Sequence, residues 1–163
     1  MNAPVAKRPA QGEKLAKAAG PAEVRVWLRL LSVTMTLEKR LRRRFADEFG
    51  TTLPRFDVMA ALDREPAGLT MSALSRALLV SNGNVTAIVR QLEGECVVAT
   101  RSDPADARSS VVSLTEHGRA WFDALAAAHH GWVADAFAGL DAGDRDALYA
   151  LLGELRHSVA GGA

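Results

Sequence analysis

The stretch "LTMSALSRALLVSNGNVTAIVRQLEGECVV", residues 69–98, decides the fold that this sequence predicts. It contains two runs of helical character, about 71–78 and about 81–93, separated by a tight turn. In the second run, apolar residues recur at i, i+3, i+4 and i+7, the spacing of one side of a helix: Val85, Ile88, Val89 and Leu92. Ser81, directly before this run, has the side chain of an N-cap. The stretch therefore predicts two short helices joined by a turn.

The opposite side of the second run carries small or polar side chains: Asn82, Gly83, Asn84, Thr86, Ala87 and Arg90. Short side chains at the beginning of a helix let it approach another surface closely. In the major groove of B-DNA, asparagine and arginine can read base edges, and threonine and alanine can contact the thymine methyl group. We therefore interpret residues 81–93 as a recognition helix.

The composition predicts a soluble protein of one domain, or of one domain with arms. The 163 residues, 48% hydrophobic and 24% charged, are enough to bury a core. The net charge is only +1, but residues 1–50 carry 11 Lys/Arg and 5 Asp/Glu, whereas residues 51–163 carry 9 and 14. This asymmetry indicates a localised basic surface, or a basic tail beside a solvated helix face.

The single cysteine, Cys96, excludes an intramolecular disulfide and is typical of a reducing compartment. No apolar run approaches the roughly 18–20 residues that a membrane helix needs. The N-terminus lacks the continuous apolar region of a secretory signal. We therefore expect a cytoplasmic protein.

Four regions follow one another along the chain. Residues 1–20 show no periodicity and predict a flexible N-terminal arm. Residues 21–53 contain a long helix, Pro21 to Phe49, with Val24, Leu28, Leu31 and Met35 on one stripe. It would span roughly 40 Å, which is long for a small core and favours packing against a partner subunit. Residues 54–114 are predicted to form a winged helix-turn-helix DNA-binding domain, and residues 115–163 two C-terminal dimerisation helices.

Residues 54–114 predict a compact domain that contains the two short helices. A helix begins near Pro54, with four residues directed inward: Phe56, Met59, Ala60 and Leu62. After Leu92, two β-rich runs flank a turn at Pro104, which predicts a β-hairpin.

The C-terminal region begins where Thr115 caps a helix over about 116–138, with Trp121, Leu125 and Val133 as anchors. Asp141 caps a last helix over about 142–159, whose inward leucines are Leu148, Leu151, Leu152 and Leu155. The order of elements predicts a mainly α fold with a small β-hairpin wing: a winged helix-turn-helix flanked by long dimerisation helices.

The segments "VSNGNVTAIVRQLE" and "DPADARSSVVSLTEHG" resemble the MarR family of bacterial transcription regulators. The resemblance covers roughly residues 24–158. Its most specific part is the order and spacing of recognition helix, wing and following capped helix. It implies an obligate homodimer in which each recognition helix enters a major groove and each wing the adjacent minor groove. Arg108 then matches the wing arginine of the minor groove, and Asp106 the carboxylate that orients it. The alternative for these two residues is an ordinary ion pair in a hairpin turn.

Ser72 and Arg76, on the outer face of the first short helix, are expected to contact phosphates, which fixes register without reading sequence. The complete set of expected DNA contacts is Ser72, Arg76, Ser81, Asn82, Gly83, Asn84, Thr86, Arg90, Asp106, Arg108 and Ser109.

One segment, Gly94-Glu95-Cys96, departs from the family pattern, which has a basic pair and then glycine. Cys96 stands where that glycine is expected, and glycine there relieves the cost of a left-handed backbone. Either the helix ends earlier, at Gly94, or Cys96 tolerates some strain. We favour a structural cysteine over a redox-active one.

The run "EKRLRRR", Glu38 to Arg44, predicts a solvated helix face, with phosphate contact or capture of an anionic ligand as rivals. The resemblance implies an effector pocket between the long helices and the winged domain, for a small anion such as an aromatic acid or an acyl-CoA. An arginine could pair with its carboxylate or phosphate. Each aromatic residue taken alone is more often part of the core than of a pocket. The candidates for this pocket are Trp27, Arg40, Arg43, Phe56, Trp121 and His129.

We expect no metal, no cofactor and no catalysis. His117, His129 and His130 do not have the spacing of a structural zinc site. The sequence has no G-x-S-x-G, P-loop, G-x-G-x-x-G or H-E-x-x-H motif. The expected function is a ligand-responsive repressor that binds a palindromic operator as a homodimer. The alternatives are a non-catalytic helical adaptor and a redox- or metal-responsive regulator.

Overall fold

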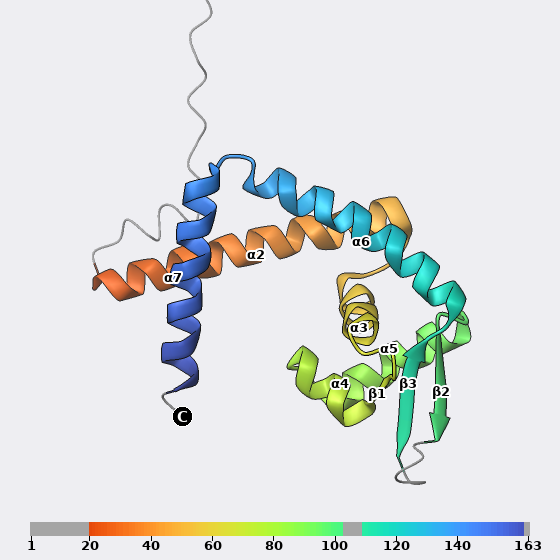
Figure 1. Cartoon of the computed structure of the whole chain (residues 1–163). Helices are drawn as coiled ribbons and strands as arrows, with labels where there is room; N and C mark the ends of the chain where they lie inside the picture. Colours follow the sequence, from red (N-terminus) through yellow and green to blue (C-terminus); the bar gives the residue numbers. More distant parts are fainter. Residues whose placement is uncertain (1–19, 103–108, 162–163) are drawn as a thin grey trace, which may run out of the picture. The chain divides into compact units, whose positions relative to one another are not determined.

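The computed structural model describes residues 20–102 and 109–161 and confirms a mainly helical fold with a small antiparallel sheet (Figure 1). The elements are α2 (Ala22–Phe49), α3 (Leu53–Asp63), β1 (Leu69–Thr70), α4 (Met71–Leu78), α5 (Asn82–Gly94), β2 (Val98–Ser102), β3 (Ser110–Leu114), α6 (Glu116–Phe137) and α7 (Ala142–Ala160). The chain divides into two compact units between Leu53 and Pro54. None of the helices in these ranges is both long and apolar enough to cross a membrane.

The first unit contains α2, a helix of 28 residues. It ends at Gly50, whose φ of 60° is the left-handed conformation that glycine adopts without a Cβ penalty. Only Leu41 and Phe45 are buried in α2. The first half exposes its apolar side chains, including Val24, Val26, Trp27, Leu31, Val33 and Met35.

Both helices of the helix-turn-helix in the second unit have side-chain N-caps, and that of α5 is the predicted Ser81. The Thr70 hydroxyl accepts a hydrogen bond from the Ala73 amide at 3.2 Å, at the start of α4. The Ser81 hydroxyl accepts one from the Asn84 amide at 3.4 Å, at the start of α5. The predicted apolar side of α5 is confirmed: Val85, Val89 and Leu92 are buried, and Ile88 is half-buried.

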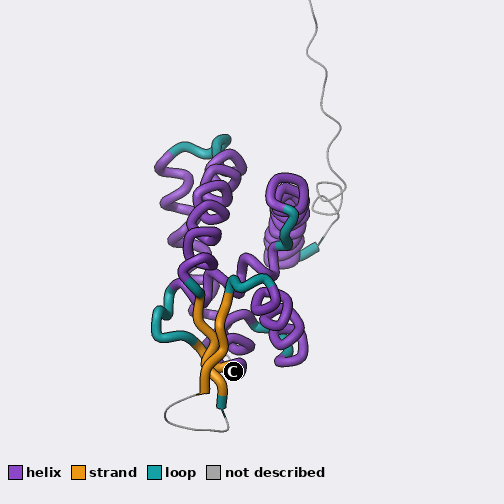
Figure 2. Tube along the Cα trace, turned by 90° about the vertical axis from the view of Figure 1, so that its right-hand side faces the viewer, coloured by secondary structure: helices purple, strands orange, loops and turns teal. Residues whose placement is uncertain are grey.

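The sheet has the strand order β1-β3-β2, and both pairs are antiparallel. β2 and β3 form the predicted hairpin and run side by side (Figure 2). The register pairs Val98 with Leu114 and Ser102 with Ser110. The strand β1 was not predicted, because two residues are too short to show the alternation of a strand.

The exit of α5 resolves the question that the sequence left open at Cys96. The helix ends at Gly94, and Cys96 nevertheless has a left-handed backbone with a φ of 58°. Its amide donates to the Glu93 carbonyl at 3.0 Å, and the Val97 amide donates to the Leu92 carbonyl at 2.9 Å. Both alternatives therefore hold: the helix ends early, and the cysteine adopts the conformation in which glycine is usual.

The first turn of α6 is bonded to this exit. The Thr115 amide donates to the Val97 carbonyl at 3.0 Å, and the Thr115 hydroxyl donates to the Cys96 carbonyl at 2.7 Å. The same hydroxyl accepts from the Gly118 amide at 2.9 Å, as an N-cap does. A Cβ on Gly118 would lie 1.9 Å from the Val97 carbonyl oxygen, so only glycine permits this approach.

Two expectations about the C-terminal helices need correction. In α6, Leu125 is buried, but Trp121 and Val133 are only half-buried, and the other buried side chains are Phe122 and Trp132. In α7 no residue is buried. The leucines expected to point inward are 36–63% exposed: Leu148, Leu151, Leu152 and Leu155. Periodicity identifies an apolar side of a helix but does not say whether the same chain covers it.

Gly118→Ala places a methyl group against the Val97 backbone, which no side-chain rotation can relieve, so we expect a loss of at least about 2 kcal/mol in the free energy of unfolding. Urea unfolding followed by circular dichroism measures it.

The matched control is Gly131→Ala in the same helix, where a Cβ meets nothing within 4 Å. Alanine there should raise helix stability by up to about 1 kcal/mol. Equal unfolding free energies for the Gly118 variant and the parent protein would contradict the close approach.

Candidate nucleic-acid interface

The outer side of α5 is available to a partner. Asn82, Gly83, Asn84 and Arg90 are exposed, as the sequence predicts, and Thr86 is half-buried. The Thr86 hydroxyl donates to the Asn82 carbonyl at 2.8 Å. Because its proton is used within the helix, Thr86 can offer a partner its methyl group or its oxygen lone pairs. The face therefore presents amide groups, a methyl group and one guanidinium on a closely approachable backbone.

The two residues expected to contact phosphates, Ser72 and Arg76, are exposed on α4. Ser81 is exposed as the N-cap of α5. The amino end of a helix carries a partial positive charge and amide donors, which favour a phosphate. The turn that joins α4 to α5 contains Leu79, with a φ of 55° and a side chain that is 93% exposed.

The wing is described in its strands only. Ser109 is half-buried just before β3, while Asp106 and Arg108 lie outside the described residues. Arg101 on β2, which the sequence reasoning missed, donates to the Ala67 carbonyl at 2.8 Å. It ties the end of β2 to the loop before β1.

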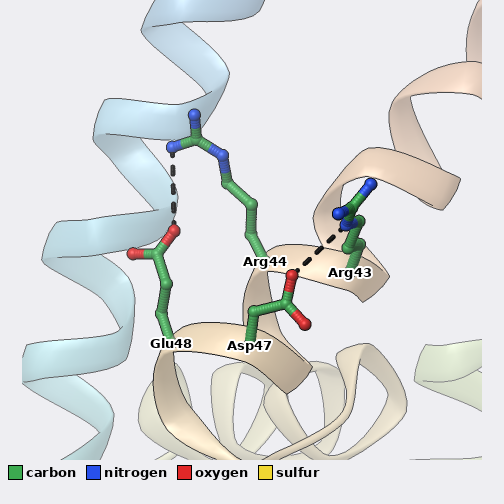
Figure 3. Close-up of polar contacts among 4 residues, drawn as sticks. All are labelled: Arg43, Arg44, Asp47 and Glu48. Atoms are coloured by element: carbon green, nitrogen blue, oxygen red, sulfur yellow. Dashed lines mark hydrogen bonds and ion pairs between the residues drawn. The ribbon is translucent and has the colours of Figure 1, made fainter.

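Three arginines of the basic run on α2 pair with carboxylates of the same helix. Arg42 lies 3.3 Å from Glu38, Arg43 lies 3.3 Å from Asp47, and Arg44 lies 4.0 Å from Glu48. The last two pairs are drawn in Figure 3. Such i,i+4 pairs are typical of a solvated helix face and partly neutralise its positive field. This arrangement favours the interpretation of the run as a solvated surface.

The candidate effector residues fall in both units. Trp27, Arg40 and Arg43 belong to the first unit, where Trp27 and Arg40 are exposed and the Arg43 side chain is 84% exposed. In the second unit, the ring of Phe56 lies 4.8 Å from that of His129 and 5.6 Å from that of Phe122. Because Phe56 is buried, these contacts are core contacts between α3 and α6.

Trp121, a candidate for contact with an effector, has Arg55 as its partner in the structure. The Arg55 guanidinium lies 5.6 Å from the centroid of its ring, a distance at which a cation and an indole attract. A cavity of about 150 Å³ lies beside it, lined by Glu95, Val97, His117 and Trp121. It is smaller than the roughly 300 Å³ at which ligand pockets usually begin.

Arg55 is a second residue that the sequence reasoning missed. It pairs with Glu95, 40 residues further along the chain. One signal in the sequence could have indicated such a partner: the end of the 81–93 helix carries Glu93 and Glu95 and no basic residue in its last turn. A negative helix end with added carboxylates favours a cation from elsewhere in the chain.

The histidines of α6 are His117, His129 and His130. Within residues 20–102 and 109–161, no group of three or more His, Cys, Asp or Glu side chains is placed to hold a metal ion. His129 lies against Phe56, and its burial, with a smaller contribution from the charge of His130, lowers its pKa below 6.5.

Comparison with known proteins gives a consistent family match. Residues 49–109 match the family model described as MarR family. The transcriptional activatory protein BadR of Rhodopseudomonas palustris is 33% identical over 104 residues. These residues make up 63% of this chain and 59% of the relative, so the match spans less than two thirds of the relative's length.

Solved structures match over most of the chain. A MarR family transcriptional regulator of Silicibacter pomeroyi is 29% identical with a TM-score of 0.72, and the match covers 93% of this chain and 99% of that one. AbsC, a MarR family transcriptional regulator of Streptomyces coelicolor, is 23% identical with a TM-score of 0.76, over 89% and 99% of the two chains. The second match supports the fold alone.

The lowered pKa of His129 gives a prediction about stability and pH. The native state disfavours the protonated imidazole, so as pH falls below 6.5 the unfolded chain takes up a proton that the native chain resists. The contribution of His129 to stability is therefore present above pH 6.5 and decreases as pH falls. We expect His129→Leu to lose less unfolding free energy than the parent protein between about pH 7.5 and about pH 5.5. Urea unfolding at each pH measures it, and parallel losses in both proteins would contradict the assignment.

Proposed function

The chain belongs to the MarR family of transcriptional regulators, and from this premise we propose that it binds operator DNA in the cytoplasm as a homodimer. The observation that carries the proposal is the surface of α5, which is capped at Ser81 and presents exposed Asn82, Asn84 and Arg90 beside the strands of a wing. The fold and family are those of regulators rather than enzymes.

In this proposal, α5 enters a major groove with its amino end first. Asn84 and Arg90 form hydrogen bonds with base edges, and the Thr86 methyl group contacts a thymine methyl group. Ser72, Arg76 and Ser81 contact phosphates and fix the register. Arg108 of the wing enters the adjacent minor groove, oriented by Asp106, and Ser109 lies beside it. Gly83 allows the backbone to approach the DNA.

The homodimer is supported by apolar side chains that the single chain leaves exposed. On α2 they include Trp27 and Met35, and on α7 they include Leu151 and Leu155. Exposed apolar surface of this extent is typical of subunit interfaces. A two-fold dimer would present two copies of α5 to half-sites about one helical turn apart, which requires a palindromic operator.

We further propose that the protein is a repressor, released by a small anionic effector such as an aromatic acid or an acyl-CoA. The effector contacts expected from the sequence stay predictions within each unit separately: Trp27, Arg40 and Arg43 in the first, and Phe56, Trp121 and His129 in the second. An effector can release the DNA only if it binds more tightly to a state with a different spacing of the two α5 helices. The relative BadR is named an activatory protein, so the direction of control needs its own measurement in a reporter strain.

The central test uses fluorescence anisotropy with the full chain and a palindromic fragment from its own promoter region. We expect specific binding that weakens steeply with salt, as phosphate contacts require. Asn84→Ala and Thr86→Ala should lower affinity for the operator by about 1–3 kcal/mol each and change the base preference. Arg76→Ala should weaken binding to all sequences alike and reduce the salt slope by about 1.

The control fragment is a scrambled duplex of the same composition. A folded dimer that binds neither fragment would contradict the proposal and favour the helical adaptor instead.

A thermal-shift screen of aromatic acids and their CoA thioesters tests the proposed effector. A true effector should raise the melting temperature of the protein and also release it from the operator. A ligand that stabilises the protein without releasing DNA would contradict that part of the proposal.

A further inference from the structure

The carboxyl end of α5 carries negative charge where a helix favours positive charge. Glu93 lies in its last turn, Glu95 is its C-cap, and the last turn contains no basic residue. The carbonyl groups at a helix end add a partial negative charge of their own. The proposed recognition helix therefore needs a cation from outside itself.

Arg55 supplies this cation from α3. Its Nη2 donates to Oε2 of Glu95, and the Cζ of the same guanidinium lies 5.6 Å from the ring centroid of Trp121. The Arg55 side chain is only 13% exposed, whereas that of Glu95 is 50% exposed. One guanidinium thus joins α3, the exit of α5 and the second turn of α6.

Because Arg55 is largely buried, its contacts with Glu95 and Trp121 favour one arrangement of α3, α5 and α6. Its Nε is buried and has no hydrogen-bond acceptor within the described part of the chain. Most of the favourable interaction of the charge therefore depends on Glu95 and Trp121. A buried charge that loses its partner is strongly unfavourable, so displacement of the α5 exit away from α3 is opposed.

We propose that Arg55 is a positioning residue for DNA recognition. It holds Glu95, and with it the carboxyl end of α5, in the orientation in which the outer face of the helix meets the operator. This inference rests on the proposed DNA-binding function and adds a residue that need not contact DNA. Recognition groups require placement to within about 0.5 Å, which a support of this kind provides.

Simpler roles for Arg55 and Glu95 predict different effects of their substitution on DNA binding. If Arg55 contacted a phosphate directly, its loss would lower the salt slope by about 1. If Glu95 were only a negative charge near DNA, its removal would strengthen binding, because repulsion from the phosphates would fall. A positioning role predicts the opposite sign for Glu95 and an unchanged salt slope.

The test is a double-mutant cycle measured as operator affinity by fluorescence anisotropy. We expect Arg55→Gln and Glu95→Gln each to weaken operator binding by about tenfold, and the double variant to be no weaker than the weaker single variant. Affinity for scrambled DNA and the salt slope should stay at the values of the parent protein. Circular dichroism and melting temperature establish that each variant is folded, and if Arg55→Gln does not fold, Glu95→Gln decides by the sign of its effect.

The matched control is Arg64→Gln, which removes one positive charge from an exposed side chain directly after α3. It should change operator affinity by less than about threefold, the effect of a distant surface charge. Tighter operator binding by Glu95→Gln, or single effects that multiply in the double variant, would overturn the positioning role. Unchanged affinity in all variants would overturn it while leaving the proposed function intact. Absence of operator binding by the parent protein would overturn both.

Discussion

The arrangement of the winged domain depends on one close backbone contact, that between Gly118 and the Val97 carbonyl. A side chain at residue 118 would occupy the position of that oxygen. The contact lets Thr115 bond to Cys96 and Val97, so the end of α5, the start of β2 and the start of α6 meet at one point. Densely packed contacts of this kind resist continuous deformation. A displacement of the first turn of α6 would therefore displace the end of α5 as well.

The two kinds of apolar surface in the chain serve different purposes. The winged domain buries its own core, with Leu74, Val85, Leu92 and Val112 fully enclosed. The helix α7 contains no fully buried residue, and the first half of α2 exposes most of its apolar side chains. Burial of apolar area is the main favourable term in both folding and association. The first surface thus stabilises the chain that presents α5, and the second is the surface that the proposed dimer would use.

Local signals made most of the fold predictable. Ser81, Thr115 and Asp141 are caps that precede periodic runs, and each begins a helix in the structure. The features that escaped prediction depend on contacts between distant residues. Nothing periodic links Arg55 to Glu95, and an apolar stripe such as that of α7 does not identify its partner. For the candidate interface, the exposure of the outer face of α5 followed from its period, whereas Asp106 and Arg108 lie outside the described residues.

The most direct measurement of DNA recognition by α5 is hydroxyl-radical and methylation-protection footprinting of the operator bound to the full chain. Two copies of α5 on a two-fold dimer should protect guanine N7 atoms in two major-groove segments about 10 base pairs apart, with backbone protection on the minor-groove side of each. Specific binding that leaves the major-groove atoms reactive would contradict the assignment of α5 as the recognition helix.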